Sequence, residues 1–293
     1  MSARPPPAVW FVAPALAAIG AFFALPVFAS LGLSLTDFDI YAIGDLRTLR
    51  FVGLDNYARL LHEPLFWTAL ANTLVFVALG APLSIAASLA AALLVNARLV
   101  RWKGLFRTLL FLPVVTTLVA VAVVWRALYH PRVGLLNGLL GALGVAPIDW
   151  LGDPRFAMPA LIAMAVWKNF GFNMVIFLAG LQSIPERLYE AACIDGAGAL
   201  AQLRAVTLPL LAPTFAFVGI STAIGSFQLF AEPYVMTGGG PANRTLSLVL
   251  LMYREGFRWW NMGSAAALAF VLFALVLAAS WLQWRLRPLE AQR

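Results

Sequence analysis

The segment "SIPERLYEAACIDGAGALAQLRAVTLPLLAP", residues 183–213, carries a dense group of polar and helix-ending residues between two strongly apolar stretches. Its first half favours a helix that runs through "ERLYEAACID". Ser183, with Glu186 three residues later, predicts a capping box at the start of this helix. Pro185 would lie in the first turn, where a backbone amide needs no intrahelical partner.

The second half of the segment predicts a turn followed by another short helix. Gly196 and Gly198 suit a helix end or a sharp turn, because glycine tolerates positive φ. A second helical stretch, "ALAQLRAVTL", then leads to Pro209 and Pro213 at the start of the next apolar run. We therefore expect a short helix, a turn and another short helix that project from the apolar stretches.

The composition around this segment is that of an integral membrane protein. The chain has 293 residues, of which 62% are hydrophobic and 11% charged, so its apolar surface exceeds what one globular core hides. A single cysteine, Cys193, excludes an internal disulfide framework, and His62 and His130 have no Cys or carboxylate nearby at metal-ligand spacing. The net charge of +7 is typical of basic cytoplasmic loops, and no basic run interleaved with aromatic residues indicates a nucleic-acid partner.

Six stretches are long enough to cross the bilayer as helices, since a helix needs about 20 apolar residues to do so. The first could instead be a signal peptide, but its apolar run is much longer than the roughly 7 to 15 residues of a signal-peptide core. The sequence predicts an all-α membrane protein with six transmembrane helices, near residues 9–34, 66–94, 105–128, 157–181, 208–230 and 262–284.

The short loop between the second and third spans predicts the orientation of the chain. It contains Arg98, Arg101, Lys103 and Arg107 and no acidic residue, and such loops stay in the cytoplasm. With six spans, both termini and the loop 183–207 are then cytoplasmic. The extracytoplasmic loops would be residues 35–65, 129–156 and 231–261.

The chemistry of the 183–213 segment is compatible with a partner-binding helix. Ala191 and Ala192 would let the helix lie close to a partner, and Leu188 and Ile194 would supply apolar anchors. The alternative is an amphipathic helix that lies on the membrane surface. Helical periodicity by itself leaves both interpretations open.

The spacing within this segment resembles the E-A-A-x3-G-x9-I-x-L-P loop of permease subunits in binding-protein-dependent ABC importers. Val206 replaces the isoleucine of that pattern. "FVGLDNYARLL" at 51–61 and "VMTGGGPANRTLSLVLLMYREGF" at 235–257 resemble segments of its carbohydrate branch, the permeases for maltose-type sugars and glycerol 3-phosphate. The positions that match the loop are Glu190, Ala191, Ala192, Gly196, Leu208 and Pro209.

This resemblance implies a type I ABC importer permease fold over residues 1–293, as one transmembrane domain in a bacterial or archaeal cytoplasmic (inner) membrane. The loop 183–207 would be the coupling helix that docks in a cleft of a cytoplasmic ATPase. The residues carried over to that contact are Glu190, Ala191, Ala192, Asp195, Gly196 and Pro209.

The nucleotide chemistry is expected on a partner. No G-x-x-x-x-G-K-[S/T] loop occurs, and Lys103 and Lys168 are the only lysines, so the chain is expected to be neither an enzyme nor a cofactor-binding protein. ATP and Mg would bind to the partner ATPase. The resemblance implies two ATPase subunits, a second homologous permease, an extracytoplasmic solute-binding protein and contact with membrane lipid. Transport would proceed by alternating access, with ATP and the loaded binding protein favouring the same outward-open state.

Polar groups at membrane depth are the candidates for the substrate pathway, because they are costly there and usually face a cavity or a partner helix. Ser and Asn can also serve only in helix packing. Lys168 could contact the phosphate of glycerol 3-phosphate, or it could instead pair with a neighbouring helix or a water-filled cavity. The resemblance favours spans four and five as the lining, and the candidates are Lys168, Asn173, Ser226, Phe227 and Gln228.

The solute implied by the resemblance is a malto-oligosaccharide, a disaccharide or glycerol 3-phosphate. The alternative function is an ion-coupled secondary transporter, which would need intramembrane acids, whereas all thirteen acids can be placed in loops or at span ends. A membrane-embedded enzyme is disfavoured because neither histidine lies inside a span. The external stretch "TGGGPANRT" predicts a tight re-entry of the chain, as opposed to an ordinary flexible turn.

Overall fold

The computed structural model describes residues 7–43, 49–97 and 99–285. These residues form helices and turns, with one isolated antiparallel bridge between Thr36 and Phe51. Arg98 of the predicted cytoplasmic loop lies outside the described residues. The chain divides into two compact units, Met1–Phe66 with Leu251–Phe273, and Trp67–Leu250 with Ala274–Arg293.

The smaller unit is organised around one buried amide. Asn56 is fully buried, and its Nδ2 donates to the carbonyl oxygens of Ser34 and Thr36, both at 2.8 Å. A Cβ on Gly263 would come within 2.3 Å of the Thr36 carbonyl oxygen, so only glycine allows this approach. The helices of this unit are α1 (Pro7–Ile19), η1 (Gly20–Ala24), α2 (Leu25–Ser34), η2 (Tyr41–Ile43), α3 (Asp55–His62), η5 (Arg254–Arg258) and the first part of α15 (Met262–Arg285).

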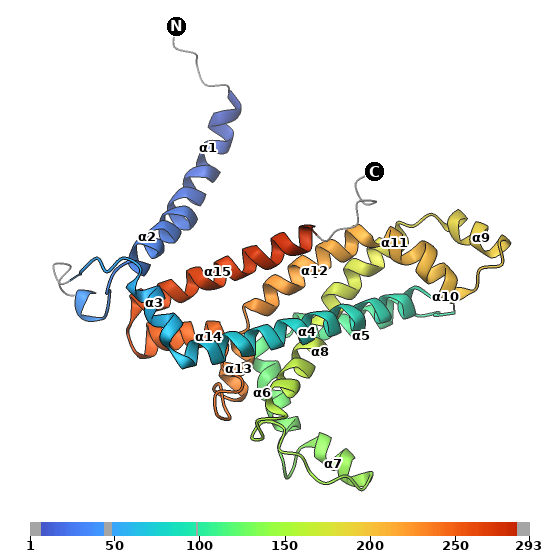
Figure 1. Ribbon diagram of the computed structural model, residues 1–293. Helices are drawn as coiled ribbons and strands as arrows, with labels where there is room; N and C mark the ends of the chain where they lie inside the picture. Colours follow the sequence, from blue (N-terminus) through green and yellow to red (C-terminus); the bar gives the residue numbers. More distant parts are fainter. Residues whose placement is uncertain (1–6, 44–48, 98, 286–293) are drawn as a thin grey trace. The chain divides into compact units, whose positions relative to one another are not determined.

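The larger unit contains most of the helices, and Figure 1 shows α7 at one end of it and α9 with α10 at the other. Three helices, α4, α14 and α15, have residues in both units. The helices are α4 (Pro64–Asn96), α5 (Lys103–Val115), α6 (Leu118–Leu128), α7 (Leu135–Ala142), α8 (Ala157–Gln182), α9 (Glu186–Ile194), α10 (Ala199–Gln202), η4 (Leu203–Thr207), α11 (Leu208–Leu210), α12 (Ala212–Phe227), α13 (Ala231–Met236) and α14 (Leu248–Tyr253).

Five of the predicted spans have counterparts that are long and apolar enough to cross a membrane: Phe11–Ser34, Pro64–Asn96, Ala157–Gln182, Ala212–Met236 and Met262–Arg285. The predicted span 105–128 differs, because it consists of α5 and α6, which meet at 96°. Thr116 and Thr117 between them are extended, with ψ of 143° and 138°. Pro113, which has no N–H to donate, weakens the last turn of α5 just before this break.

Helix α8 forms the centre of the larger unit, and two glycines allow neighbouring helices to approach it. A Cβ on Gly171 would lie 2.3 Å from the carbonyl oxygen of Leu110 in α5, and one on Gly180 would lie 2.6 Å from Thr214 Oγ1 in α12. Phe177 is fully buried between these contacts and meets Phe215 edge to face at 4.9 Å. The close approach and the apolar burial together hold α5, α8 and α12 as one packed group.

Candidate transport cavity and coupling segment

A cavity of about 460 Å³ lies at the place where two helical spans are interrupted. Val114 and Leu118, on the two sides of the break between α5 and α6, both line it. So do residues 228–230, which separate α12 from α13. Irregular backbone is tolerated at membrane depth only where it is buried in protein or lines a cavity. The cavity therefore explains how both helical spans can be interrupted at this place.

Three of the predicted pathway residues, Asn173, Ser226 and Gln228, line this cavity. Asn173 Nδ2 donates to Thr222 Oγ1 at 2.9 Å, which joins α8 to α12 across the cavity wall. Ser226 Oγ donates to the Thr222 carbonyl oxygen at 2.8 Å. The wall thus presents hydroxyl and amide groups whose positions are fixed by hydrogen bonds within the protein.

The other two predicted pathway residues do not line the cavity. Phe227 is 4% exposed and packed in the protein, whereas Phe172 and Phe230 face the cavity. Lys168 is buried, and its Nζ donates to the carbonyl oxygen of Val114 at 3.0 Å. That carbonyl is one of the last four of α5, which have no intrahelical partner, and the end of a helix favours a cation. Lys168 therefore pairs with a neighbouring helix, the second of the two alternatives.

Sequence reasoning did not consider Ser84 and Glu232, two polar residues of the lining. The sequence predicts Glu232 in the external loop 231–261, but it lies in α13, within the apolar span Ala212–Met236, and is 7% exposed. The placement of all thirteen acids in loops or at span ends was therefore wrong for Glu232. A signal was present: Pro233, which suits the first turn of a helix, follows Glu232 and indicates that a helix begins there.

The segment predicted to couple to an ATPase forms α9, a turn, and the nearly continuous series α10, η4 and α11, as expected from its two helical stretches. Its predicted capping box is wrong. The Oγ of Ser183 donates to the Gly180 carbonyl oxygen at 2.7 Å and so completes the end of α8. Pro185 is the residue before α9 and makes no side-chain cap, because its ring has no polar atom.

The turn after α9 depends on Gly196, which has a φ of 77°. Asp195 ends the helix; the N–H of Gly196 donates to the Cys193 carbonyl oxygen at 3.0 Å, and the N–H of Ala197 to that of Ala192 at 2.8 Å. This pair of bonds is the Schellman arrangement, which requires a left-handed residue where Gly196 lies. Gly198 has a φ of −71° and makes no use of this freedom.

Two side-chain contacts fix α9 against the chain that follows it. Gln202 Nε2 donates to the Ala197 carbonyl oxygen at 2.9 Å and to Cys193 Sγ at 3.1 Å. The hydroxyls of Tyr189 and Thr207 lie 3.0 Å apart. Tyr189 also packs on the apolar core cluster that contains Phe177 of α8 and Val218 of α12. Helix α9 is thereby in contact with the apolar cluster that α8 and α12 share.

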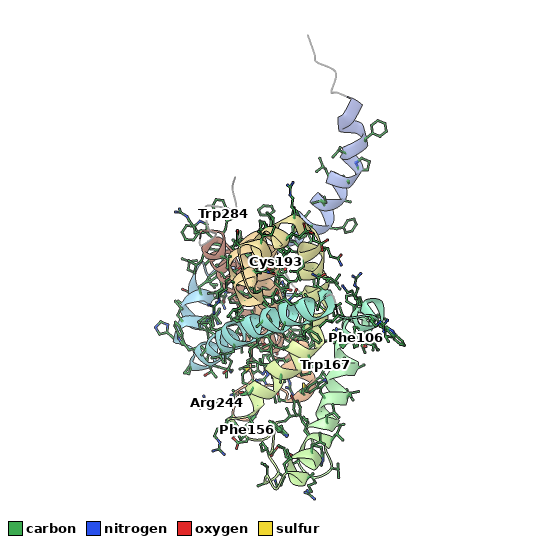
Figure 2. The ribbon with its side chains drawn as sticks, turned by 90° about the vertical axis from the view of Figure 1, so that its right-hand side faces the viewer. Phe106, Phe156, Trp167, Cys193, Arg244 and Trp284 are labelled. Atoms are coloured by element: carbon green, nitrogen blue, oxygen red, sulfur yellow. The ribbon has the colours of Figure 1, made fainter. Side chains whose placement is uncertain are left out.

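The surface of α9 is available to a partner, since none of its residues is buried. Ile194 is 86% exposed, and Leu188 and Leu200 are exposed as well. Figure 2 shows Cys193 of α9 and Phe156, which precedes α8, at opposite ends of the larger unit, with Trp167 of α8 between them. The exposed segment and the 129–156 loop therefore lie at opposite ends of α8.

The stretch "TGGGPANRT", residues 237–245, which is predicted to be external, is held by hydrogen bonds. Gly238 and Gly239 have φ of 60° and 91°. The hydroxyls of Thr237 and Thr245 lie 2.6 Å apart, and Asn72 Nδ2 of α4 donates to the Asn243 carbonyl oxygen at 2.7 Å. The stretch is thus a shaped turn tied to α4, as predicted, and differs from an ordinary flexible loop.

The other predicted external loop of this unit, residues 129–156, is organised by Asn137. Its amide donates to the Pro131 and Ile148 carbonyl oxygens and accepts from the Ile148 N–H and from Trp150 Nε1. At its end, hydrogen bonds from Arg155 lower the pKa of Asp153, although this exposed pair contributes little to stability.

Known proteins share both the sequence and the fold of this chain. The sequence model of the family described as "Binding-protein-dependent transport system inner membrane component" matches residues 83–289. The lactose transport system permease protein LacF of Rhizobium radiobacter is 39% identical over 279 residues, which cover 94% of this chain and 91% of the relative. The trehalose/maltose transport system permease protein MalF of Thermococcus litoralis is 36% identical over 270 residues, covering 91% and 88%.

Among solved structures, the fold matches that of a bacterial alginate ABC transporter crystallised with an alginate pentasaccharide-bound periplasmic protein. The TM-score is 0.79 at 21% identity, and the match covers 94% of this chain and 92% of the other. At this identity the likeness is one of fold.

Proposed function

The chain belongs to the family of binding-protein-dependent transport system inner membrane components and is a multi-pass membrane protein; on this premise, we propose that it is the permease subunit of an ATP-driven sugar importer. The observation that carries the proposal is the cavity at the two interrupted spans, whose wall offers mostly uncharged hydroxyl and amide groups together with aromatic rings. These groups suit a sugar, which has many hydroxyls and apolar ring faces.

The lining supports a disaccharide or a short malto-oligosaccharide better than glycerol 3-phosphate. A phosphate needs a cation or several directed N–H groups, and Lys168, the intramembrane lysine, is engaged with the Val114 carbonyl oxygen outside the lining. The relatives named for lactose and for trehalose or maltose act as further support for a sugar.

We further propose that the α9 to α11 segment docks on a cytoplasmic ATPase, with Glu190, Ala191, Ala192, Asp195, Gly196 and Pro209 at or beside the contact. The exposure of α9 and its stiffening by the Gly196 turn support this role. An exposed helix that is fixed before binding loses little conformational freedom when it docks. ATP and Mg would be bound by the ATPase subunits alone.

The geometry suggests how ATP hydrolysis reaches the solute. When two ATPase subunits close on ATP, each would displace the coupling segment of one permease, and a second homologous permease completes the pair. In this chain Tyr189 transmits that displacement to α8 and α12 through the apolar cluster. The same two helices carry Asn173 and Ser226 in the cavity wall. Motion of α9 would thus move Asn173 and Ser226 and change the shape of the cavity wall.

A solute-binding protein would deliver the sugar at the opposite end, where residues 129–156 and the 237–245 turn lie. The fold neighbour was crystallised with such a periplasmic protein. This orientation predicts that a cysteine at Arg101, in a chain whose Cys193 has been replaced by serine, reacts with a membrane-impermeant reagent only from the cytoplasm. A cysteine at Ala242 should react only from outside, and the reverse pattern would invert the topology.

Family membership favours ATP-driven import over an ion-coupled secondary transporter. The buried acid Glu232 removes the sequence argument against ion coupling, so the energy source needs a direct test. The complete transporter in proteoliposomes should take up sugar from a loaded binding protein when ATP is supplied on the ATPase side. A non-hydrolysing ATPase variant should stop uptake, and an imposed proton or sodium gradient should not restore it. Uptake driven by the gradient alone would overturn the proposal.

A further inference from the structure

The cavity wall contains one charged side chain among the described residues, and it is acidic. Glu232 is 7% exposed and faces the cavity from α13. The nearby cation is Lys168 of α8, whose charge acts on the carboxyl group of Glu232. A buried carboxylate is costly unless it is paired or hydrogen-bonded, so a carboxylate inside a membrane span indicates a functional role.

The charge of Lys168 assists the burial of this carboxylate without cancelling its effect on the cavity. The ammonium donates to the Val114 carbonyl oxygen and lies outside the lining, behind the wall. A solute in the cavity therefore meets the carboxylate directly and the ammonium only through protein. The cavity is expected to have a negative potential, which attracts cations and disfavours anions.

A second observation points to a ligand in the same cavity. Ser84 of α4 is 5% exposed and lines the cavity, and its Oγ has no hydrogen-bond partner among the described residues. A serine in a helix can donate to the carbonyl four residues earlier, as Ser88 does to Ser84 at 2.5 Å. Ser84 leaves this option unused, so its hydroxyl lies at the cavity wall with its hydrogen-bonding capacity unfilled by the described residues.

We propose that Glu232 and Ser84 bind hydroxyl groups of the transported solute and that the Glu232 carboxylate restricts the pathway to solutes without negative charge. A carboxylate accepts hydrogen bonds from sugar hydroxyls, and these charge-assisted bonds are stronger than neutral ones. A uronic acid, a sulfonated sugar or a sugar phosphate would instead bring a second negative charge next to the first. This inference rests on the proposed function as a sugar permease and specifies the charge of its substrate.

A solved transporter of this fold is involved in the import of alginate, an acidic polysaccharide. Shared fold therefore leaves the charge of the solute open.

The first test measures the potential in the cavity and needs no substrate. In the assembled transporter with Cys193→Ser, a cysteine placed at Ser221, which lines the cavity, is reacted with thiosulfonate reagents of similar size and opposite charge. Relative to a cysteine at the exposed Leu143, the cationic reagent should be favoured about tenfold, the effect of one nearby charge in a partly desolvated site. Glu232→Gln should remove this preference, whereas Glu232→Asp should retain it.

A variant that fails to fold does not prevent this test from deciding the charge assignment. If Glu232→Gln fails to assemble, the preference in the intact chain and in Glu232→Asp still decides the matter, and Lys168→Met, which removes the opposing charge, should strengthen it. Equal reaction rates of the two reagents in the intact chain would overturn the charge assignment.

The second test concerns the solute itself. The loaded transporter is offered a neutral disaccharide and the matching uronate, each with a binding protein that accepts it, and the ratio of the two uptake rates is measured. Glu232→Gln should shift that ratio toward the uronate about tenfold, and Ser84→Ala should lower uptake of both solutes together. If both sugars enter equally well in the intact chain, the charge restriction fails while the sugar permease stands. If neither enters with ATP, the proposed function fails.

Discussion

The cavity wall and the α9 to α11 segment are both polar, but they differ in burial and in what holds their side chains. The cavity residues are placed by packed helices, and contacts such as Asn173 to Thr222 lie between α8 and α12. Helix α9 has no buried residue, and the α9 to α11 segment depends on a few local bonds around Gly196, Gln202 and Tyr189. A buried site takes its precision from the fold, whereas an exposed docking segment must be stiffened locally.

The largest effect should follow a change in the packing behind the cavity. Gly171→Ala places a Cβ 2.3 Å from the Leu110 carbonyl oxygen and forces α5 away from α8. Such overpacking costs about 1–3 kcal/mol of stability and disturbs the break that forms the wall. We expect a lower thermal unfolding temperature in detergent and a strong loss of transport. Gly219→Ala in α12, where a Cβ meets nothing within 4 Å, is the matched control and should behave like the parent.

A smaller cost is expected at the turn of the docking segment, with a selective loss of coupling. Gly196→Val forces a branched residue to a φ of 77°, at about 1–2 kcal/mol, although its Cβ has open space. The transporter should insert and keep its thermal stability within a few degrees, but stimulation of ATPase activity by loaded binding protein should fall at least tenfold.

Gly198→Ala is the control for that change, because its φ of −71° suits alanine and its surroundings are open. Equal stimulation of ATPase activity in the two variants would mean that the shape of the turn is irrelevant to coupling. The α9 to α11 segment would then not depend on local stiffening, in contrast to the cavity wall.

The bond between Tyr189 and Thr207 should contribute less, about 0.5–1.5 kcal/mol. Tyr189→Phe and Thr207→Val each remove one partner, and the double variant should be no worse than the more impaired single variant. The readout is stimulated ATPase activity at matched expression. Strictly additive losses would show that the two hydroxyls act independently and do not fix α9 to the chain after it.

The smallest effect should come from Glu190→Ala, which removes an exposed charge without altering the backbone. We expect the affinity for the ATPase subunit to weaken about two- to fivefold, as is typical of a charge at the rim of an interface. The dependence of binding on salt should also become weaker. Asp153→Asn, which breaks an exposed ion pair at the other end of the unit, should leave the affinity unchanged.

Local patterns predicted the features of this chain that local forces determine. The apolar runs predicted the positions of the spans, and the two glycines after "ACID" predicted the end of α9, where Gly196 is left-handed. Three of the five pathway candidates also line the cavity, because polar residues inside an apolar span usually face such a space.

The remaining features depend on tertiary partners that a single sequence does not display. The break at Thr116 and Thr117 requires Lys168, from a helix distant in the chain, to satisfy a free carbonyl. Glu232 is predicted in a loop because the helix is interrupted at residues 228–230. The apolar pattern therefore does not show that the span continues into α13. The capping box failed because Ser183 had a competing acceptor at the end of the preceding helix.

The pairing of Lys168 with the Val114 carbonyl oxygen also bears on the order in which the protein is made. A lysine at the centre of an isolated membrane helix costs about 3 kcal/mol on insertion. Because a chain is synthesised from its N-terminus, α5 enters the membrane before α8, and its unpaired carbonyl is present when Lys168 arrives. The Val114 carbonyl oxygen is therefore synthesised before the lysine that donates to it. A circular permutant that begins between α6 and α8 would reverse the order of synthesis, and Lys168 would be exposed to lipid until α5 is inserted.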